Sequence, residues 1–320
     1  MEGMEIKGAR ILLTGGCGFI GSQLLKSLIS SGANITVLDI FLDPRSIFAQ
    51  SNLAKFVNLK FIDIRDRKKV LDIFKKSKPS YVIHLAAQPL IEEAYLNPYD
   101  SFQTNIMGTV NILDAARIQG NIKGIIVASS DKAYGKTEKV YKEDSPLSGD
   151  HPYDVSKSCE DLIAQSYYKT YNLPIIITRF ANVYGEGDFH FGRIIPDICK
   201  TIVKKETLLL RSNGKYVRDY IYVGDVVAGY IHLLKNADKV KGEAFNFSSE
   251  DNLSVVEVIN RCEKILKIKI PFKILNKAKN EIPYQHLNYS KIKKIGWVPK
   301  YSLENSLEKT FLWYKMILNK

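Results

Sequence analysis

The chain has 320 residues, 45% of them hydrophobic and 25% charged, which are ordinary values for a globular protein of one or two domains. No apolar run approaches the roughly 20 residues that a membrane-spanning helix needs, so we expect no membrane contact. The net charge of +12 arises mostly in the last sixty residues, where fourteen Lys and Arg outnumber four Asp and Glu. Without a basic stripe interleaved with aromatic residues, this excess does not predict nucleic-acid binding.

Short apolar runs alternate with amphipathic runs along the first half of the chain. The apolar runs predict strands and the amphipathic runs predict helices. In chain order we expect strand Arg10–Leu13, helix Ile20–Ser31, strands Ile35–Asp39 and Leu59–Ile64, helix Arg67–Lys76, strand Tyr81–Ala86, helix Pro98–Arg117, strand Ile125–Ser129, helix Tyr153–Tyr171 and strand Ile175–Arg179. This alternation is typical of a doubly wound parallel sheet with helices on both faces.

The regular alternation of strands and helices ends after Asn182, where glycines separate shorter elements. A further strand, Ala244–Phe247, and a helix, Val255–Leu266, are expected there. We therefore predict an α/β protein with two domains. Residues 1–180 form the nucleotide-binding domain, and residues 181–320 form a smaller, mixed α/β substrate-binding domain, with segments near 216–245 returning to the first.

Three glycines, Gly15, Gly18 and Gly21, lie between the first predicted strand and the first predicted helix. In a Rossmann-type fold such glycines permit a tight turn, close approach of the backbone to a pyrophosphate, and close helix–strand packing. Asp39 ends the second predicted strand, where a carboxylate hydrogen-bonds the ribose hydroxyls and repels a 2′-phosphate. This arrangement predicts NAD as the cofactor.

Two short segments combine groups suited to acid–base chemistry. Tyr153 and Lys157 are four residues apart, so a helix places them on one face, and the ammonium favours the phenolate of Tyr153. Ser130, Asp131 and Lys132 follow a predicted buried strand and add a hydroxyl, a carboxylate and an amine. The Asp131–Lys132 pair is either catalytic or a structural ion pair at the end of the strand.

The four cysteines, Cys17, Cys159, Cys199 and Cys262, are widely spaced and have no histidine at metal-ligand spacing. We expect reduced, buried thiols in a cytoplasmic protein and no metal site.

Several segments together resemble the extended short-chain dehydrogenases/reductases that act on nucleotide sugars, and the resemblance covers nearly the whole chain. The spacing of the three glycines is that of this family. The other matching segments are Asp63–Asp66, His84–Gln88, Thr104–Thr109, Tyr153 with Lys157, Arg179–Gly185 and Arg218–Val223. Within this family, His84–Leu90 and Glu281–Gln285 are most similar to CDP-glucose 4,6-dehydratases, whereas Arg218–Asp225 matches the broader family.

The resemblance implies roles for individual residues. His84 is expected to support the fold beside the cofactor. The implied cofactor-binding residues are Gly15, Gly18, Phe19, Ile20, Gly21, Asp39, Asp63, Ile64, Leu85, Ala86, Ala87, Asn105, Tyr153 and Lys157. The implied substrate-binding residues are Gln88, Asn182, Arg193, Arg211 and Arg218, where arginines suit a diphosphate.

The family chemistry implies that Tyr153, with Ser130 and Lys157, oxidises the sugar at C4. A 4,6-dehydratase then eliminates water across C5–C6 and returns the hydride to C6. Asp131 matches the acid that protonates the leaving hydroxyl, and Lys132 stands where other dehydratases place a glutamate base. The sequence therefore predicts a nucleotide-sugar 4,6-dehydratase of deoxysugar biosynthesis, with a 4-epimerase and a non-catalytic NAD-binding module as alternatives. The nucleotide, the sugar and the stereochemistry at C5 stay open.

In related proteins the helices at Pro98–Arg117 and Tyr153–Tyr171 pair across a two-fold axis. We therefore expect a homodimer formed through a four-helix bundle, with packing inside one subunit as the alternative.

Overall fold

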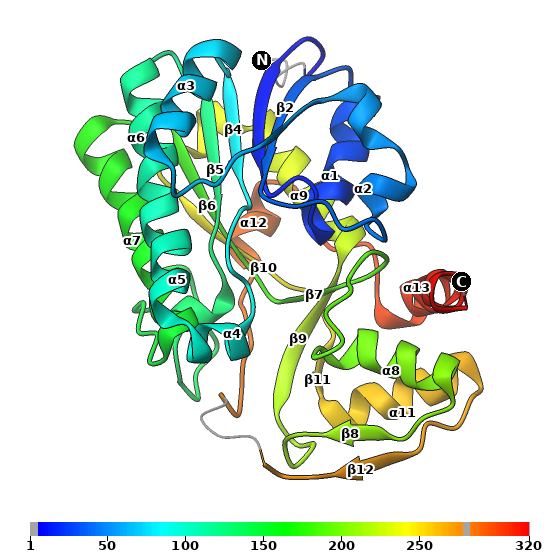
Figure 1. Ribbon diagram of the computed structural model, residues 1–320. Coiled ribbons are helices and arrows are strands. Elements are labelled where there is room, and N and C mark those ends of the chain that lie inside the picture. The colour runs from blue at the N-terminus through cyan, green and yellow to red at the C-terminus, as the bar shows by residue number, and fades with distance from the viewer. Residues whose placement is uncertain (1–5, 278–281, 320) are drawn as a thin grey trace. The chain divides into compact units, whose positions relative to one another are not determined.

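The computed structural model describes residues 6–277 and 282–319, so Glu281 of the Glu281–Gln285 segment lies outside the described residues (Figure 1). The chain folds as two compact units. The first comprises Met1–Gly135, Glu143–Arg179 and Val227–Phe245, and the second comprises Lys136–Lys142, Phe180–Val226 and Asn246–Lys320. The domain division at residue 180, made from the sequence, stays a prediction.

A central sheet dominates the first unit. Its described strands are β1 (Arg10–Thr14), β2 (Asn34–Asp39), β3 (Asn58–Phe61), β4 (Tyr81–His84), β5 (Gly124–Ala128), β6 (Ile175–Phe180) and β10 (Ala244–Phe247), in the order β10-β6-β5-β4-β1-β2-β3. The pairs from β3 through to β6 are parallel. This is the strand order of a Rossmann-type doubly wound sheet, which confirms the predicted fold class. The order reverses between β1 and β4, where such sheets bind their ligands.

Helices cover both faces of this sheet because its strands are apolar on both sides. The main ones are α1 (Phe19–Ser30), α3 (Arg67–Ser77), α6 (Gly108–Gln119), α7 (Pro152–Tyr171) and α9 (Val223–Lys235). Figure 1 shows α3, α6 and α7 on one side and α1 on the other. Strand residues such as Leu12, Val82 and Ile125 pack with Phe74 of α3 and Ile112 of α6 in a fully buried core.

Shorter helical segments complete this unit. They are α2 (Ile47–Gln50), α4 (Ile91–Leu96), α5 (Pro98–Phe102), α10 (Ala237–Val240) and two 3₁₀ turns, η1 (Leu53–Phe56) and η3 (Asp131–Tyr134). The helix predicted over Pro98–Arg117 differs in one respect: a π-helical turn, Gln103–Met107, separates α5 from α6. The wider turn contains Asn105, which is 1% exposed and whose side chain bonds to residues far away in the sequence.

In the described residues, a mixed three-stranded sheet, a parallel pair of strands and three packed helices form most of the second unit. The strands are β7 (Asn182–Tyr184), β8 (Leu208–Leu210), β9 (Val217–Tyr222), β11 (Asn252–Ser254) and β12 (Phe272–Ile274). In the order β11-β9-β7, one pairing is antiparallel and one parallel, and β12 pairs with β8 in parallel. The helices α8 (Ile194–Lys204), α11 (Val255–Leu266) and α13 (Leu303–Leu318) pack together, and α12 (Ser290–Lys294) is short.

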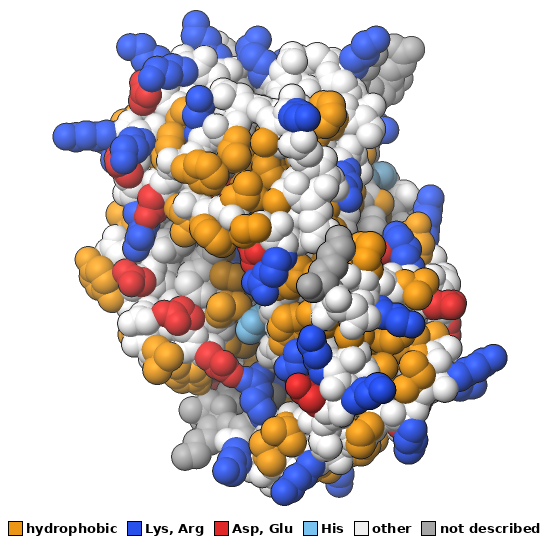
Figure 2. Space-filling model, turned by 45° about the vertical axis from the view of Figure 1, so that its right-hand side comes forward, with side chains coloured by type: hydrophobic (Ala, Val, Ile, Leu, Met, Phe, Trp, Pro, Cys, Tyr) orange, Lys and Arg blue, Asp and Glu red, His pale blue; other side chains and the backbone are white. Residues whose placement is uncertain are grey.

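Two surface properties bear on the predictions from composition. No helix among the described residues is long and apolar enough to cross a membrane. Figure 2 shows Lys and Arg side chains scattered over the visible face among acidic and hydrophobic ones, without a continuous basic stripe.

Candidate active site

The loop between β1 and α1 depends on its glycines in different ways. Gly15 has a φ of +73°, and a Cβ on it would lie 2.8 Å from the backbone nitrogen of Ala86. A Cβ on Gly21 would lie 2.2 Å from the carbonyl oxygen of Gly15. A Cβ on Gly18 would meet only this same oxygen, at 3.4 Å, an ordinary contact. Packing within the chain therefore requires Gly15 and Gly21, whereas a closely bound ligand would explain Gly18.

The N-terminus of α1 is open to an anion. Its N-cap is Gly18, which makes no side-chain cap, and the first turn contains no acidic residue. Phe19 and Ile20, in that turn, are half-buried. The first N–H groups of a helix lack intrahelical partners and attract negative charge. This terminus, preceded by a glycine loop at the sheet's switch point, fits the pyrophosphate of a dinucleotide.

Asp39 closes the site at the end of β2. Its Oδ2 accepts a hydrogen bond from the Cys17 backbone N–H at 2.8 Å, and its Oδ1 accepts one from Ile40 at 2.8 Å. Burial raises the pKa of Asp39, although these backbone hydrogen bonds act in the opposite direction. The carboxylate is thus fixed beside the glycine loop, where it can accept hydrogen bonds from ribose hydroxyls.

Asp63 and Ile64 follow β3. Asp63 accepts hydrogen bonds from Arg65 Nε and Nη2 at 2.8 and 2.7 Å. Burial would raise the pKa of Asp63, but these hydrogen bonds lower it overall. Ile64 is buried, and its carbonyl oxygen accepts a bond from Asn111.

His84 is held in a buried chain of hydrogen bonds. Thr109 Oγ1 donates to the Asn105 carbonyl at 2.7 Å, so it accepts from His84 Nε2 at 3.0 Å. His84 Nδ1 then accepts from Thr14 Oγ1 at 2.7 Å, and this hydroxyl accepts from the Ala86 N–H. Burial lowers the pKa of His84 to about 3, so the ring is neutral. This geometry makes His84 a support for the strand ends.

The segment after β4 is fixed by Asn105. Its Oδ1 accepts from the Gln88 N–H at 2.7 Å, and its Nδ2 donates to Gln88 O and to Ser156 Oγ at 3.1 and 2.9 Å. The Gln88 side chain bonds to Leu90 and to Ser101 Oγ. Of the residues expected here, Leu85, Ala86 and Ala87 are half-buried, and the backbone of Leu85 and Ala86 lies beside Gly15.

Ser130, Asp131 and Lys132 form a compact cluster on η3. Ser130 is the N-cap of this turn: its Oγ accepts from Lys132 N at 3.2 Å and donates to Asp131 Oδ1 at 3.1 Å. Lys132 Nζ lies 3.4 Å from the same Asp131 oxygen. The side chains of Asp131 and Lys132 are 4% and 17% exposed. Because these groups share one oxygen, a change in the charge of Asp131 directly affects both neighbours.

A buried arginine anchors this turn to the rest of the unit. Arg179 of β6 donates to Tyr134 Oη at 2.6 Å and forms two hydrogen bonds with Asp161 of α7, at 2.8 and 2.9 Å. Its charge also lies over the Tyr134 ring. A paired, hydrogen-bonded arginine is the arrangement in which a buried charge is stable.

Tyr153 and Lys157 begin α7, whose first residue is Pro152. Tyr153 is 8% exposed and Lys157 is 4% exposed. Lys157 Nζ donates to the Ala128 carbonyl at 2.8 Å and to Glu160 Oε2 at 2.7 Å. Lys157 and Tyr153 also interact electrostatically. Sequence reasoning missed Glu160, although its spacing of three residues after Lys157 indicated a shared helix face.

Two more titratable residues, His151 and Asp154, flank Tyr153 in the sequence and were also missed. His151 Nε2 lies 3.0 Å from Asp154 Oδ2, and Asp154 is fully buried. Together with Asp150 they place three possible ligand atoms within 4.8 Å of one another. Carboxylates in the first turn complement the helix dipole, and Lys132 adds a favourable charge near Asp154. We assign no metal to this cluster.

The expected substrate-binding residues of the second unit each have a partner within it. Asn182 Nδ2 donates to the Asp219 carbonyl at 3.2 Å, and Arg193 pairs with Asp188 at 2.9 Å. Arg211 donates to the Gly192 carbonyl at 3.0 Å, and Arg218 donates to the Val217 carbonyl at 2.8 Å. Their roles toward a substrate stay predictions.

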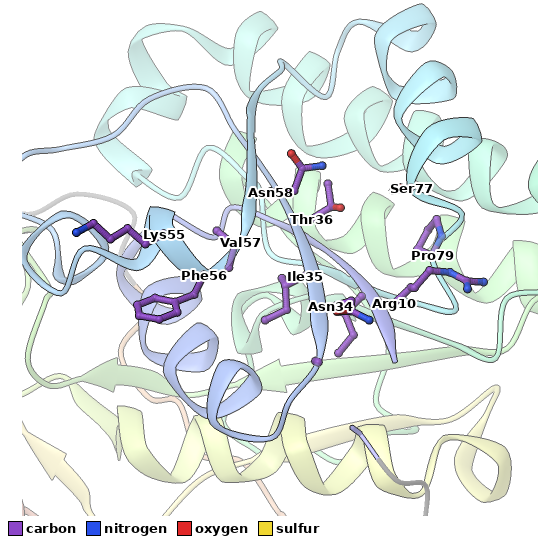
Figure 3. A pocket seen from close by; sticks show the side chains of 12 residues that line it. Arg10, Asn34, Ile35, Thr36, Lys55, Phe56, Val57, Asn58, Ser77 and Pro79 are labelled. Atoms are coloured by element: carbon purple, nitrogen blue, oxygen red, sulfur yellow. The ribbon is translucent and has the colours of Figure 1, made fainter. Parts of the chain in front are cut away.

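A cavity of about 560 Å³ opens at the other end of the sheet. Figure 3 shows it lined by Arg10, Asn34, Thr36, Lys55, Phe56 and Pro79 among others, around the amino ends of β1 and β2. None of the lining residues is an expected site residue. Ligands of open parallel sheets bind at the carboxyl ends, so we assign this cavity no part in the chemistry.

This fold and this glycine-lined helix terminus define an enzyme of the short-chain dehydrogenase/reductase class. The family described as the NAD-dependent epimerase/dehydratase family matches residues 11–248, and the chain belongs to it. The family description names the cofactor expected from the sequence, so NAD is confirmed as the cofactor.

Known relatives are similar over almost the whole chain. CDP-glucose 4,6-dehydratase of Salmonella typhimurium is 30% identical over 97% of this chain and 91% of its own length. The low-salt glycan biosynthesis protein Agl12 of Haloferax volcanii is 32% identical, over 95% and 98% respectively. Among solved structures, UDP-glucose 4-epimerase of Thermotoga maritima has a TM-score of 0.87 at 29% identity, over 96% of this chain and 99% of that one.

Proposed function

We propose that this enzyme is an NAD-dependent nucleotide-sugar 4,6-dehydratase, a lyase that produces a 4-keto-6-deoxy sugar. The cluster of Ser130, Asp131 and Lys132 at the start of η3, with Ser130 and Asp131 buried, supports this choice. A 4-epimerase needs no acid–base pair beside Ser130, whereas a dehydratase does. Relatives whose names specify 4,6-dehydratases support the same choice.

The residues have separate tasks in this proposal. Tyr153 accepts the proton of the C4 hydroxyl while Ser130 hydrogen-bonds to the same oxygen. Lys157 stabilises the Tyr153 phenolate by its charge and binds the nicotinamide ribose. The chemistry that bound NAD would supply is reversible hydride transfer, from C4 of the sugar and back to C6. The glycine loop, the N-terminus of α1 and Asp39 hold the cofactor's pyrophosphate and ribose.

The 4-ketone acidifies the proton at C5, which makes elimination possible. Lys132, as a neutral amine, accepts this proton, and Asp131 protonates the C6 hydroxyl so that it leaves as water. A proton passed from the Lys132 ammonium to Asp131 Oδ1, which lies 3.4 Å away, gives both the neutral amine and the carboxylic acid that this step requires. Arg193, Arg211 and Arg218 are the proposed contacts to the diphosphate.

Mass spectrometry of the products tests this function. CDP- and dTDP-glucose are the first substrates, followed by UDP- and GDP-sugars, in H₂O and in D₂O. We expect loss of one water and incorporation of deuterium at C5. Products of unchanged mass without carbon-bound deuterium would establish an epimerase, and bound NAD without turnover would favour a binding module.

A variant isolates the step that distinguishes the two reactions. Asp131→Asn keeps the size of the side chain but removes its proton transfer. We expect C4 oxidation, seen as a rise in NADH absorbance, to persist while water loss falls at least about 100-fold. Equal losses in both steps would contradict an acid role for Asp131.

We further propose a cytoplasmic homodimer that pairs through α6 and α7. Met107, beside α6, together with Ile118, Leu162 and Tyr171, is 43–55% exposed. Leu162→Glu places a charge on this surface and should halve the mass measured by light scattering. Leu312→Glu, on an equally exposed residue of α13, is the control and should leave the mass unchanged.

A further inference from the structure

Glu160 is a buried acidic residue of α7 to which the mechanism proposed above gives no role. Glu160 lies three residues after Lys157, and its side chain is 2% exposed. An isolated buried carboxylate is strongly disfavoured, so its partner matters. That partner is Lys157, whose Nζ lies 2.7 Å from Glu160 Oε2 and whose side chain is 5% exposed.

The contacts of Lys157 restrict where its charge can lie. An ammonium has three N–H donors, and here two of them point to the Ala128 carbonyl and to Glu160. Ala128 ends β5 directly before the segment that leads to Ser130. Tyr153, Lys157 and Glu160 follow each other at spacings of four and three residues, so they occupy one stripe of the helix.

We propose that Glu160 is a positioning residue for the Tyr153–Lys157 pair: its carboxylate holds the Lys157 ammonium in place and partly neutralises the charge that acts on Tyr153. This inference deepens the proposed function and rests on the roles given there to Tyr153 and Lys157. Glu160 itself contacts Lys157 and no reacting group.

The titratable groups that interact with Lys157 and Glu160 shift the pKa of each in a definite direction. Burial lowers the pKa of Lys157, but Glu160, Tyr153 and Asp161 raise it overall. Burial raises the pKa of Glu160 to about 7, against the effect of Lys157 and with that of Asp161. Glu160 also interacts with Tyr230 of α9, whose own pKa is raised. His84 also interacts with Lys157 and stays neutral, because burial lowers its pKa to about 3.

Removing the negative charge should therefore shift two titrations in the same direction. Without Glu160, burial lowers the pKa of Lys157, so the ammonium is lost at a lower pH. Below that pH, the uncompensated ammonium stabilises the Tyr153 phenolate more strongly, so Tyr153 also ionises at a lower pH.

The first measurement is the pH profile of kcat for NAD-loaded Glu160→Gln. We expect both limbs of the bell-shaped profile to move to lower pH by on the order of one unit, the size of shift that one close charge causes. Glu160→Asp restores the charge and should return the limbs toward those of the wild type. Asp114→Asn removes a carboxylate that pairs with Arg67 and Arg117 in the same helical layer, and should move neither limb.

A second measurement needs no substrate. The tyrosinate absorbance of the NAD-loaded protein, minus that of Tyr153→Phe, reports ionisation of Tyr153 alone, and Glu160→Gln should lower its midpoint. Unchanged limbs and an unchanged midpoint, with only a lower melting temperature, would overturn the inference. Absence of turnover with every nucleotide sugar would instead count against the proposed function, while the titration still tests Glu160.

Discussion

Two backbone hydrogen bonds fix the Asp39 carboxylate beside the glycine loop, and burial raises the pKa of this group. A carboxylate so constrained needs no reorganisation to accept hydrogen bonds from a ribose. Its charge also repels a phosphate on the 2′-hydroxyl. We therefore expect this one side chain to affect both the affinity for NAD and the choice between NAD and NADP.

Asp39→Asn should weaken NAD binding by about 1.5–3 kcal/mol, roughly 10- to 150-fold, because charge-assisted hydrogen bonds are lost. Binding of NADP should be unchanged or stronger. Calorimetric titration of the cofactor-free protein with both dinucleotides measures this. Asp43→Asn is the control, since this half-buried residue pairs with Arg45 in the same loop. Parallel losses for NAD and NADP would show that Asp39 only supports the fold.

At the scale of elements, the glycines between β1 and α1 are required for two different reasons: packing within the chain and the proposed binding of the cofactor. Gly21 lies so close to the Gly15 carbonyl that a Cβ cannot fit, whereas Gly18 has room for one. The two glycines look alike in the sequence but differ in what requires them. The chain itself requires Gly21, and the proposed pyrophosphate contact requires Gly18.

Gly18→Ala should leave the melting temperature within about 2 °C of the wild type, because its φ of −75° suits alanine. NAD affinity should nevertheless fall strongly. Gly21→Ala should lower the melting temperature by at least about 4 °C and weaken NAD binding as well. Thermal denaturation of the cofactor-free proteins and NAD titration give the comparison. Intact NAD binding in Gly18→Ala would exclude a pyrophosphate contact at this glycine.

At the scale of the whole molecule, buried titratable groups make stability depend on pH. His84 has an ordinary pKa near 6.5 when unfolded and about 3 when folded. As the pH falls below 6.5, His84 becomes protonated in the unfolded chain but stays neutral in the folded chain. Stability therefore decreases from pH 6.5 downward, by up to about 1.4 kcal/mol per pH unit from this group.

His84→Asn should flatten this slope between pH 6 and 4, even though it lowers stability at pH 7 by disrupting the Thr14–Thr109 connection. Urea denaturation at several pH values measures the slope directly. His286 is the contrast: its hydrogen bond to Asp219 raises its pKa, so its contribution is present below pH 6.5 and lost at higher pH. A slope in His84→Asn equal to the wild type's would exclude His84 as its source.

The sequence by itself determined the class of the protein, because the deciding signals are local. Apolar strands of four to six residues, the glycine spacing and Asp39 at a strand end each depend on a short window of residues. The Tyr153–Lys157 spacing follows in the same way from the geometry of one helix. These signals predicted the parallel sheet and NAD, and they placed the strand ends within one residue except at β3 and β4, whose predicted ends lie three and two residues too late.

Only the tertiary structure decided how the candidate site is held together, because those contacts join residues distant in the chain. Asn105 links the segment after β4 to Ser156 through a π-helical turn that no local pattern marks. Arg179 orders η3 through Tyr134, across 45 positions. Glu160 shares its helix with Lys157, yet its importance follows from burial, which raises the strength of every charge interaction and depends on the whole fold.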